Sequence, residues 1–158
     1  EKGLWTRFIG SEIKGKTVGL LGFGAIARLV AKKLQCFNVE VIAFDLYPNE
    51  QAAKEIGVRM TTQEEVITKS DIVSIHIPAT PETHHLFNKE TIASMKDGAY
   101  LINPARGALV DLNAVAEALT SGKLAGAAMD AFEVEPLPLD SPILKCEYRS
   151  DSAHRSRD

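Results

Sequence analysis

A glycine-rich turn near the start of the sequence has the residue types and spacing of a pyrophosphate-binding site. The sequence GFGAIA at residues 22–27 follows the apolar run KTVGLL at 16–21 and precedes a stretch with helical apolar spacing. Gly22 permits a tight turn, Gly24 lets a phosphate approach the backbone, and the small Ala27 lets the helix pack closely against the strand. The phosphates would then face the positive end of the helix dipole. Taken alone, the pattern is weak, because an ordinary strand-to-helix turn can have the same residues.

Asp45 is a second residue that fits a ligand-binding site at the glycine-rich turn. It follows the apolar run VEVIAF at 39–44, 18 residues after Ala27, where a carboxylate can accept both ribose hydroxyls of an adenosine. The alternative is a solvated aspartate at a strand end. No Arg or Lys occurs from Asp45 to Ala53, so a 2′-phosphate there would lack a compensating cation. Together the two features predict dinucleotide binding, with NAD preferred over NADP.

Other polar segments lie where later apolar runs end. His76, Ile77 and Pro78 close one run, NPARG at 103–107 closes the next, and Asp130 closes the last. Open α/β sheets bind ligands beyond the carboxyl ends of their strands. We therefore expect these ends to form one crevice with the glycine turn.

Arg106 and Glu135 are the candidate catalytic residues in this crevice. Arg106 is flanked by alanine and glycine, and its planar guanidinium suits a substrate carboxylate held by two parallel hydrogen bonds; the alternative is a surface ion pair. Glu135 is interpreted as the buried partner of a catalytic histidine, which it would hold in one tautomer with a raised pKa. The alternative is an exposed carboxylate in an acidic loop with Glu133.

The elements that must position these residues alternate along the chain. This alternation predicts a doubly wound parallel sheet with helices on both faces, and the continuous apolar runs indicate strands buried on both faces. The expected strands are 16–21, 39–44, 58–60, 72–77, 98–102 and 124–129, and the expected helices are 25–34, 49–56, 62–69, 89–95 and 111–119.

Composition narrows the classes of protein. The chain has 158 residues, 45% hydrophobic and 25% charged, as in a single globular domain. Its formal charge of −3 offers no basic field for nucleic acid or an anionic membrane, and no apolar run approaches the roughly 20 residues of a membrane span. Cys36 and Cys146 form neither a metal ligand set nor a disulfide framework, which favours a reducing, cytoplasmic location.

The order and spacing of four motifs resemble the NAD-binding domain of the D-isomer-specific 2-hydroxyacid dehydrogenases, the family of phosphoglycerate, lactate, glycerate and formate dehydrogenases. The resemblance extends from Trp5 to Lys145. The motifs are GFGAIA with Asp45, SIHIPATPET at 74–83, NPARG at 103–107, and AMDAFEVEP at 128–136.

The resemblance implies roles for individual residues in moving a hydride between NAD(H) and a D-2-hydroxy acid or 2-oxo acid. Arg106 would anchor and polarise the 2-oxo acid, and Glu135 would pair with the acid/base histidine. The implied cofactor contacts are Gly22 and Gly24 in the turn, backbone amides of Ala25 and Ile26 on the pyrophosphate, Asp45 on the ribose, Ile77, Pro78 and Thr83 along the adenine and nicotinamide path, the backbone of Pro104, and Asp130 on the carboxamide.

Two departures from the family concern the ends of the chain. Such enzymes begin with a separate substrate domain, which does not precede Glu1, so we expect residues 1–145 to be the dinucleotide-binding domain alone and the chain alone to be inactive. Residues 146–158 read as an atypical polar tail where the family has a strand and a Pro-His pair. His154 follows alanine and lies among arginines, so it is not predicted to be the catalytic base.

We expect the tail to be either disordered or frameshifted. Codons for Tyr148 to Asp158 can be chosen so that a one-base shift encodes IVVTPHTAAA, which restores the strand and the Pro-His pair. Nucleotide sequencing near residue 147 tests this hypothesis. A displaced frame without proline-histidine would reject it.

The remaining histidines are weaker candidates, and no metal site is predicted. His76 is expected to be packed or hydrogen-bonded beside the cofactor, and His84 and His85 are expected to be solvated. The leading interpretation is a phosphoglycerate dehydrogenase-like domain, a homodimer in its full-length form, acting on a small 2-oxo or 2-hydroxy acid. The alternatives are a non-catalytic NAD-sensing, corepressor-like module and an adenosylhomocysteinase-like dinucleotide domain, although the latter does not predict NPARG followed by EVEP.

Overall fold

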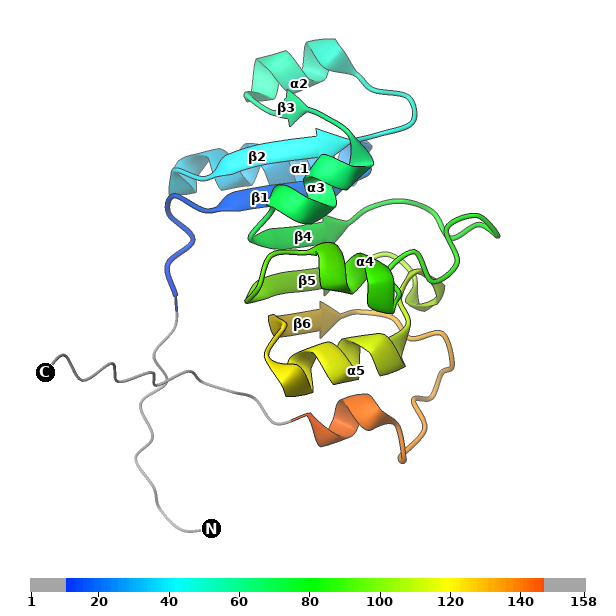
Figure 1. Cartoon of the computed structure of the whole chain (residues 1–158). Coiled ribbons are helices and arrows are strands. Elements are labelled where there is room, and N and C mark those ends of the chain that lie inside the picture. The colour runs from blue at the N-terminus through cyan, green and yellow to red at the C-terminus, as the bar shows by residue number, and fades with distance from the viewer. Residues whose placement is uncertain (1–10, 147–158) are drawn as a thin grey trace, which may run out of the picture.

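The computed structural model of the chain describes residues 11–146 (Figure 1). Its centre is one parallel sheet of six strands in the order β3-β2-β1-β4-β5-β6. The chain runs outward from β1 to one edge and then from β4 to the other, which is the doubly wound topology that the sequence predicts. The strands are β1 (Thr17–Leu21), β2 (Glu40–Phe44), β3 (Arg59–Met60), β4 (Ile72–Ile75), β5 (Ala99–Asn103) and β6 (Leu124–Met129).

Helices connect the strands, and four of the five α-helices begin at a residue whose side chain accepts hydrogen bonds from the first turn. These four capping residues are Asn49, Thr62, Asn88 and Asp111. The helices are α1 (Ala25–Leu34), α2 (Glu50–Ile56), α3 (Gln63–Lys69), α4 (Lys89–Ser94) and α5 (Leu112–Ser121), with short 3₁₀ turns η1 (Gln35–Phe37), η2 (Gly107–Leu109) and η3 (Pro142–Lys145).

Two hydrophobic cores hold the helices against the sheet. On the face turned toward the viewer in Figure 1, α3, α4 and α5 pack on the strands, and the shared core includes Leu21, Val73 and Leu101. On the other face, α1 and α2 pack on the first strands, in a core that includes Leu20 and Ala27. Alternate residues of β1 thus enter opposite cores, as strand geometry requires.

Helices cover both faces of the sheet as predicted, but the expectation that every strand is buried on both faces is wrong for β5 and β6. Burial alternates along β5, where Tyr100 is 41% and Ile102 is 37% exposed. Both side chains point away from α4 and α5, to a side on which residues 11–146 supply no helix. Gly126 of β6 lies beside the Tyr100 ring, where a Cβ would come within 2.9 Å of Cδ1.

The predicted elements are otherwise confirmed, with boundaries that differ by a residue or two. Among the strands the largest difference is at β4, which ends at Ile75 although the apolar run continues to Ile77. Pro78 has no N–H for a ladder hydrogen bond, so the chain leaves the sheet before it. No helix within the described residues is long and apolar enough to cross a membrane.

Candidate active site

The carboxyl ends of β1, β2, β4, β5 and β6 lie on one edge of the sheet, at the arrowheads in Figure 1, because all the strands are parallel. We call the segments that follow these ends the carboxyl rim. Hydrogen bonds tie neighbouring ends together: Gly22 N to Phe44 O (2.7 Å), His76 N to Leu21 O (2.6 Å) and Asp130 N to Asn103 O (3.0 Å). The prediction that these strand ends gather at one edge is confirmed.

The two glycines of the first turn differ in whether the fold requires them. Gly22 has φ +97°, and a Cβ there would lie 2.6 Å from the carbonyl oxygen of His76. The fold therefore requires glycine at this position. Gly24 has φ −73°, and a Cβ there would meet no atom within 4 Å. The fold does not require this glycine, and the space in front of its backbone is open to a ligand.

The first turn of α1 supplies unpaired backbone donors at the carboxyl rim. Its cap residue, Gly24, has no side chain to accept from the turn, and the turn contains no acidic residue. Ala25 and Ile26 are exposed, and the first amides of an α-helix have no intrahelical acceptor. A diphosphate would complement both these donors and the helix dipole, so the residues present fit the dinucleotide that the turn predicts.

Asp45 is held beside this turn by its own hydrogen bonds. Its Oδ2 accepts from Phe23 N at 2.7 Å and its Oδ1 from Tyr47 N at 2.9 Å. The carboxylate is half-buried, and within residues 11–146 no Lys or Arg forms an ion pair with it. Because each oxygen has two lone pairs, both can still accept a ribose hydroxyl. A merely solvated aspartate does not need this fixed orientation.

The segment after β4 forms a closed loop that begins at Ile77 and Pro78. Thr83 Oγ1 donates to Pro78 O at 3.0 Å and accepts from Thr80 N at 2.8 Å. Thr83 and Ile77 are half-buried, whereas Pro78 is exposed. The loop thus presents apolar surface at the carboxyl rim without a charged side chain from these four residues.

His76, just before this loop, is packed and hydrogen-bonded as predicted. Its Nε2 lies 3.0 Å from Ser74 Oγ. Burial lowers the pKa of His76, so the imidazole is neutral near pH 7. His76 therefore adds no charge to the adjacent part of the carboxyl rim.

The NPARG segment is shaped by a side chain whose role the sequence analysis missed. Asn103 is 1% exposed; its Oδ1 accepts from Ala105 N at 3.1 Å and its Nδ2 donates to Arg106 O at 2.8 Å. Asn103 is therefore a positioning residue for Arg106. The available signal was an amide residue directly before a proline at a strand end, where its side chain can replace ladder hydrogen bonds.

Arg106 is exposed, and its Nη1 donates to Ala105 O at 2.8 Å. Within the described part of the chain, no carboxylate lies within ion-pair distance of its guanidinium. Arg106 therefore does not form the alternative, a surface ion pair, with any carboxylate of residues 11–146. Pro104 and Asp130 are likewise exposed at the ends of β5 and β6, on the same rim.

The expectation that Glu135 is buried is wrong. Its side chain is exposed, and its Oε1 accepts from Phe132 N at 2.9 Å, which closes a tight turn. Gly107 packs against the backbone of this turn, but no histidine among residues 11–146 hydrogen-bonds to Glu135. His154 and the rest of the predicted tail lie outside the described residues. The pairing of Glu135 with a histidine stays a prediction.

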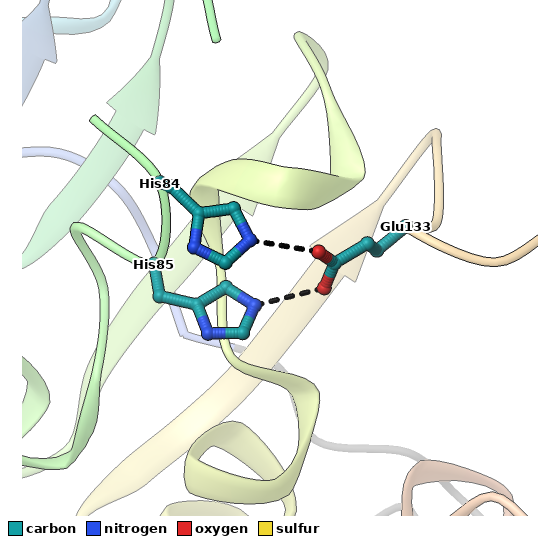
Figure 2. A group of neighbouring side chains, drawn as sticks. All are labelled: His84, His85 and Glu133. Carbon is teal, nitrogen blue, oxygen red and sulfur yellow. Dashed lines mark hydrogen bonds and ion pairs between the residues drawn. The ribbon is translucent and has the colours of Figure 1, made fainter. Parts of the chain in front are cut away.

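A neighbouring glutamate has the histidine contacts instead. His84 Nε2 lies 2.8 Å from Glu133 Oε1, and His85 Nε2 lies 2.8 Å from Glu133 Oε2 (Figure 2). Both imidazoles are accessible to solvent, as expected, but each also hydrogen-bonds to Glu133, which the sequence did not predict. The expectation of no metal site stays a prediction. His84 and His85, in the loop after β4, are 49 and 48 positions from Glu133, in the segment after β6. Because of this separation, the sequence did not predict the cluster.

A cleft of about 910 Å³ lies away from the carboxyl rim, between α4, α5 and η3. Apolar groups such as Ile92, Ala114 and Ala118 line it, together with Cys146. None of its lining residues follows a strand, so its chemistry differs from that of the rim. We assign the candidate active site to the rim because the convergent polar groups lie there.

Comparison with known proteins agrees with this geometry. The sequence profile of the family described as D-isomer specific 2-hydroxyacid dehydrogenase, NAD binding domain, matches residues 1–156. The chain belongs to this family. D-3-phosphoglycerate dehydrogenase of Bacillus subtilis is 48% identical over 139 residues, which are 88% of this chain and 26% of that protein. Glyoxylate reductase of Thermofilum pendens is 47% identical over 137 residues, 86% of this chain and 40% of that protein.

Solved structures of the same family share the fold. NAD-dependent formate dehydrogenase from Staphylococcus aureus, in complex with NAD, has a TM-score of 0.79 and 39% identity, covering 87% of this chain and 40% of that one. D-mandelate dehydrogenase of Rhodotorula graminis has a TM-score of 0.78 and 32% identity, covering 83% and 39%. This NAD-binding domain therefore spans less than half the length of the relatives it matches.

Proposed function

We propose that this chain is the NAD-binding part of an oxidoreductase that transfers a hydride between NAD(H) and a D-2-hydroxy acid or 2-oxo acid. The observation that carries the proposal is the uncapped first turn of α1, open in front of Gly24 and flanked by the fixed carboxylate of Asp45. An anionic diphosphate and a ribose diol complement those two features.

In this proposal, different residues of the carboxyl rim bind different parts of the cofactor. Backbone amides of Ala25 and Ile26 hold the pyrophosphate, and Asp45 accepts from the adenosine ribose. When bound, the nicotinamide accepts or supplies the hydride. The turn glycines, Gly22 and Gly24, leave room for the phosphates, and the remaining contacts are Ile77, Pro78, Thr83, the backbone of Pro104, and Asp130 toward the carboxamide.

Arg106 binds and polarises the substrate in this proposal. Its guanidinium has donors that no carboxylate among residues 11–146 occupies, and its fork geometry matches a carboxylate. The Asn103 brace fixes its backbone, which lowers the entropic cost of orienting it. Glu135 orients the histidine that moves a proton on the substrate oxygen, and that histidine is not among the described residues.

Substrate, assembly and location are finer parts of the proposal. We infer a phosphoglycerate dehydrogenase-like substrate, a 2-oxo acid with a phosphorylated side chain, because the relative from Bacillus subtilis has that activity in its name. We infer a homodimer for the full-length form. A reducing cytoplasmic location is supported by Cys36 and Cys146, both free thiols in the structure.

NADH fluorescence titration of the chain tests cofactor binding. We expect NADH to bind at least about tenfold more tightly than NADPH, since Asp45 opposes a 2′-phosphate. We expect no appreciable NADH oxidation with 2-oxo acids, because no histidine of residues 11–146 contacts Glu135. No saturable NADH binding would overturn the proposal.

A non-catalytic NAD-sensing module is the second candidate, favoured by the exposure of Glu135 and its lack of a histidine partner in the described part of the chain. Titration of the chain–NADH complex with glyoxylate or 3-phosphohydroxypyruvate, followed by fluorescence, separates the two. The dehydrogenase proposal expects saturable binding that Arg106→Ala abolishes while NADH affinity is unchanged. A response that Arg106→Ala does not alter would favour the sensing module.

A further inference from the structure

The loop after β4 and the segment after β6 bring three side chains of metal-ligand type together outside the proposed NAD contacts. The potential ligand atoms of His84, His85 and Glu133 all lie within 4.8 Å of one another. Figure 2 shows both imidazoles pointing toward the same carboxylate. We propose that these residues form a site for one divalent transition-metal ion of the Zn²⁺ type.

The backbone explains how two consecutive histidines face one point. Side chains of adjacent residues in an extended strand point to opposite sides. His85 instead has φ +48°, in the left-handed region that non-glycine residues seldom adopt. The two rings consequently stack, with centroids 4.0 Å apart and planes 20° apart. A conformation of this kind persists only where surrounding structure holds it.

Fixed structure holds the histidine side of the cluster. His85 N donates to Ala108 O at 2.8 Å, and Phe87 N donates to Leu109 O at 3.0 Å. The Phe87 side chain is fully buried and anchors the loop two residues after His85. Both imidazoles are therefore placed before an ion arrives, which lowers the cost of ordering them.

The glutamate side is held as firmly. Gly107 packs so closely that a Cβ there would overlap the backbone of Phe132 and Glu133. Phe132 N donates to Glu135, which closes the turn that contains Glu133. The carboxylate of Glu133 is exposed and faces both imidazoles, so it is accessible as an anionic ligand.

The donor set selects the class of metal. Two imidazole nitrogens and one carboxylate suit Zn²⁺, Ni²⁺, Co²⁺ or Cu²⁺, whereas Mg²⁺ and Ca²⁺ prefer all-oxygen sites. The imidazoles are 50% and 36% exposed, so water can reach the remaining coordination positions. Binding replaces the two His–Glu hydrogen bonds with metal–ligand bonds of about 2.0–2.2 Å from the three side chains. Each imidazole must then carry its proton on Nδ1 so that the lone pair of Nε2 can bind the ion, and any proton in excess is released to solvent.

An ion at this site would link two parts of the carboxyl rim. His84 directly follows Thr83 of the loop proposed to line the cofactor path, and Glu133 lies between Asp130 and Glu135. The ion would hold these segments together more strongly than the present hydrogen bonds. The proposal itself does not depend on the proposed dehydrogenase function.

Isothermal titration of the untagged chain with ZnSO₄ tests the site, and CoCl₂ absorption reports its coordination. We expect one Zn²⁺ per chain, a visible Co²⁺ spectrum of nitrogen and oxygen ligation, and no heat with MgCl₂. His84→Ala, His85→Ala and Glu133→Gln should each weaken Zn²⁺ binding by at least about tenfold. Glu117→Gln, another exposed glutamate in an ion pair, and His154→Ala are matched controls that should retain it.

Three results would overturn the proposal: a Zn²⁺ affinity weaker than about 1 mM, binding unchanged in the three ligand variants, or binding lost in His154→Ala. Circular dichroism melts establish that each variant is folded, and Glu133→Gln, nearly isosteric, keeps the test decisive if a histidine variant unfolds. NADH titration of the same proteins reports separately on the proposed function.

Discussion

The turn after β1 and the turn after β5 meet at the carboxyl rim but are constructed in opposite ways. The first uses backbone alone: Gly22 takes a conformation that a side chain would prevent, and the amides of α1 are left without a capping side chain. The second uses a buried side chain, Asn103, to fix the chain around Arg106. One turn thus presents main-chain donors to a ligand, and the other presents a single cation.

This difference indicates which partner each turn needs. Backbone donors and a dipole recognise a diphosphate from one side, so the first turn is complete within the described residues. A single guanidinium binds a small acid, but tight binding in one orientation needs other groups that enclose the acid. The comparison therefore predicts that changes at the first turn alter stability or NADH affinity. Changes at the second turn should instead alter the structure that positions Arg106.

The largest effect should come from Gly22→Ala. The substitution combines an unfavourable φ of +97° with a Cβ 2.6 Å from His76 O, and we expect a loss of about 3 kcal/mol in the free energy of unfolding. The melting temperature, measured by circular dichroism, should fall by roughly 6–12 °C. Gly98→Ala is the matched control, because Gly98 has φ +73° with nothing within 4 Å; an equal loss there would show that the contact with His76 contributes nothing.

Asn103→Ala should have the next largest effect, a loss of about 2 kcal/mol in stability. It removes two part-buried hydrogen bonds, to Ala105 N and Arg106 O, and leaves a cavity at the buried Asn103 position. Chemical denaturation measures the loss, and the exposed Asn113→Ala is the control. A variant as stable as the original chain would mean that the turn does not need its brace.

Gly24→Ala should separate affinity from stability within the first turn. A Cβ at Gly24 meets no protein atom, so we expect a stability change below about 1 kcal/mol. The added methyl group would occupy the phosphate space, so NADH affinity should fall at least about tenfold, or about 1.4 kcal/mol. Unchanged NADH affinity in a fluorescence titration would remove the pyrophosphate from this turn.

The smallest effect concerns Asp45. Asp45→Ala should weaken NADH by about fivefold, or about 1 kcal/mol, through lost ribose hydrogen bonds, and should narrow the preference for NADH over NADPH. Asp45→Asn, which preserves side-chain size, checks that the narrowing follows the charge. A cofactor ratio that stays the same in both variants would contradict the assigned role.

Much of the fold and the rim could be predicted from local signals. Apolar runs located the strands, and each α-helix starts within one residue of its expected start. Parallel pairing then required the strand ends to share an edge. The strand-to-helix turn at Gly22 and the place of Asp45 beside it were predictable because short sequence spacing determines both.

Features that depend on distant contacts could not be predicted. The cluster of His84, His85 and Glu133 joins residues 48 and 49 positions apart, and nothing in the local pattern of either segment indicates the other. The sequence of β5 is as apolar as that of a strand covered on both faces. Exposure at Tyr100 could not be predicted, because it depends on which helices the topology places over that face. Glu135 is similar: its exposure follows from the absence of covering atoms in residues 11–146.

The uncapped start of α1 has a thermodynamic consequence. The opening amides of α1 are exposed to water, and an anion bound there would replace that water and stabilise the first turn of the helix. Linkage then makes the resistance of the domain to heat and denaturant a function of cofactor concentration, by about 2.7 kcal/mol at a hundredfold excess over the dissociation constant. Cellular NAD supply would in this way help to set how long the folded chain survives.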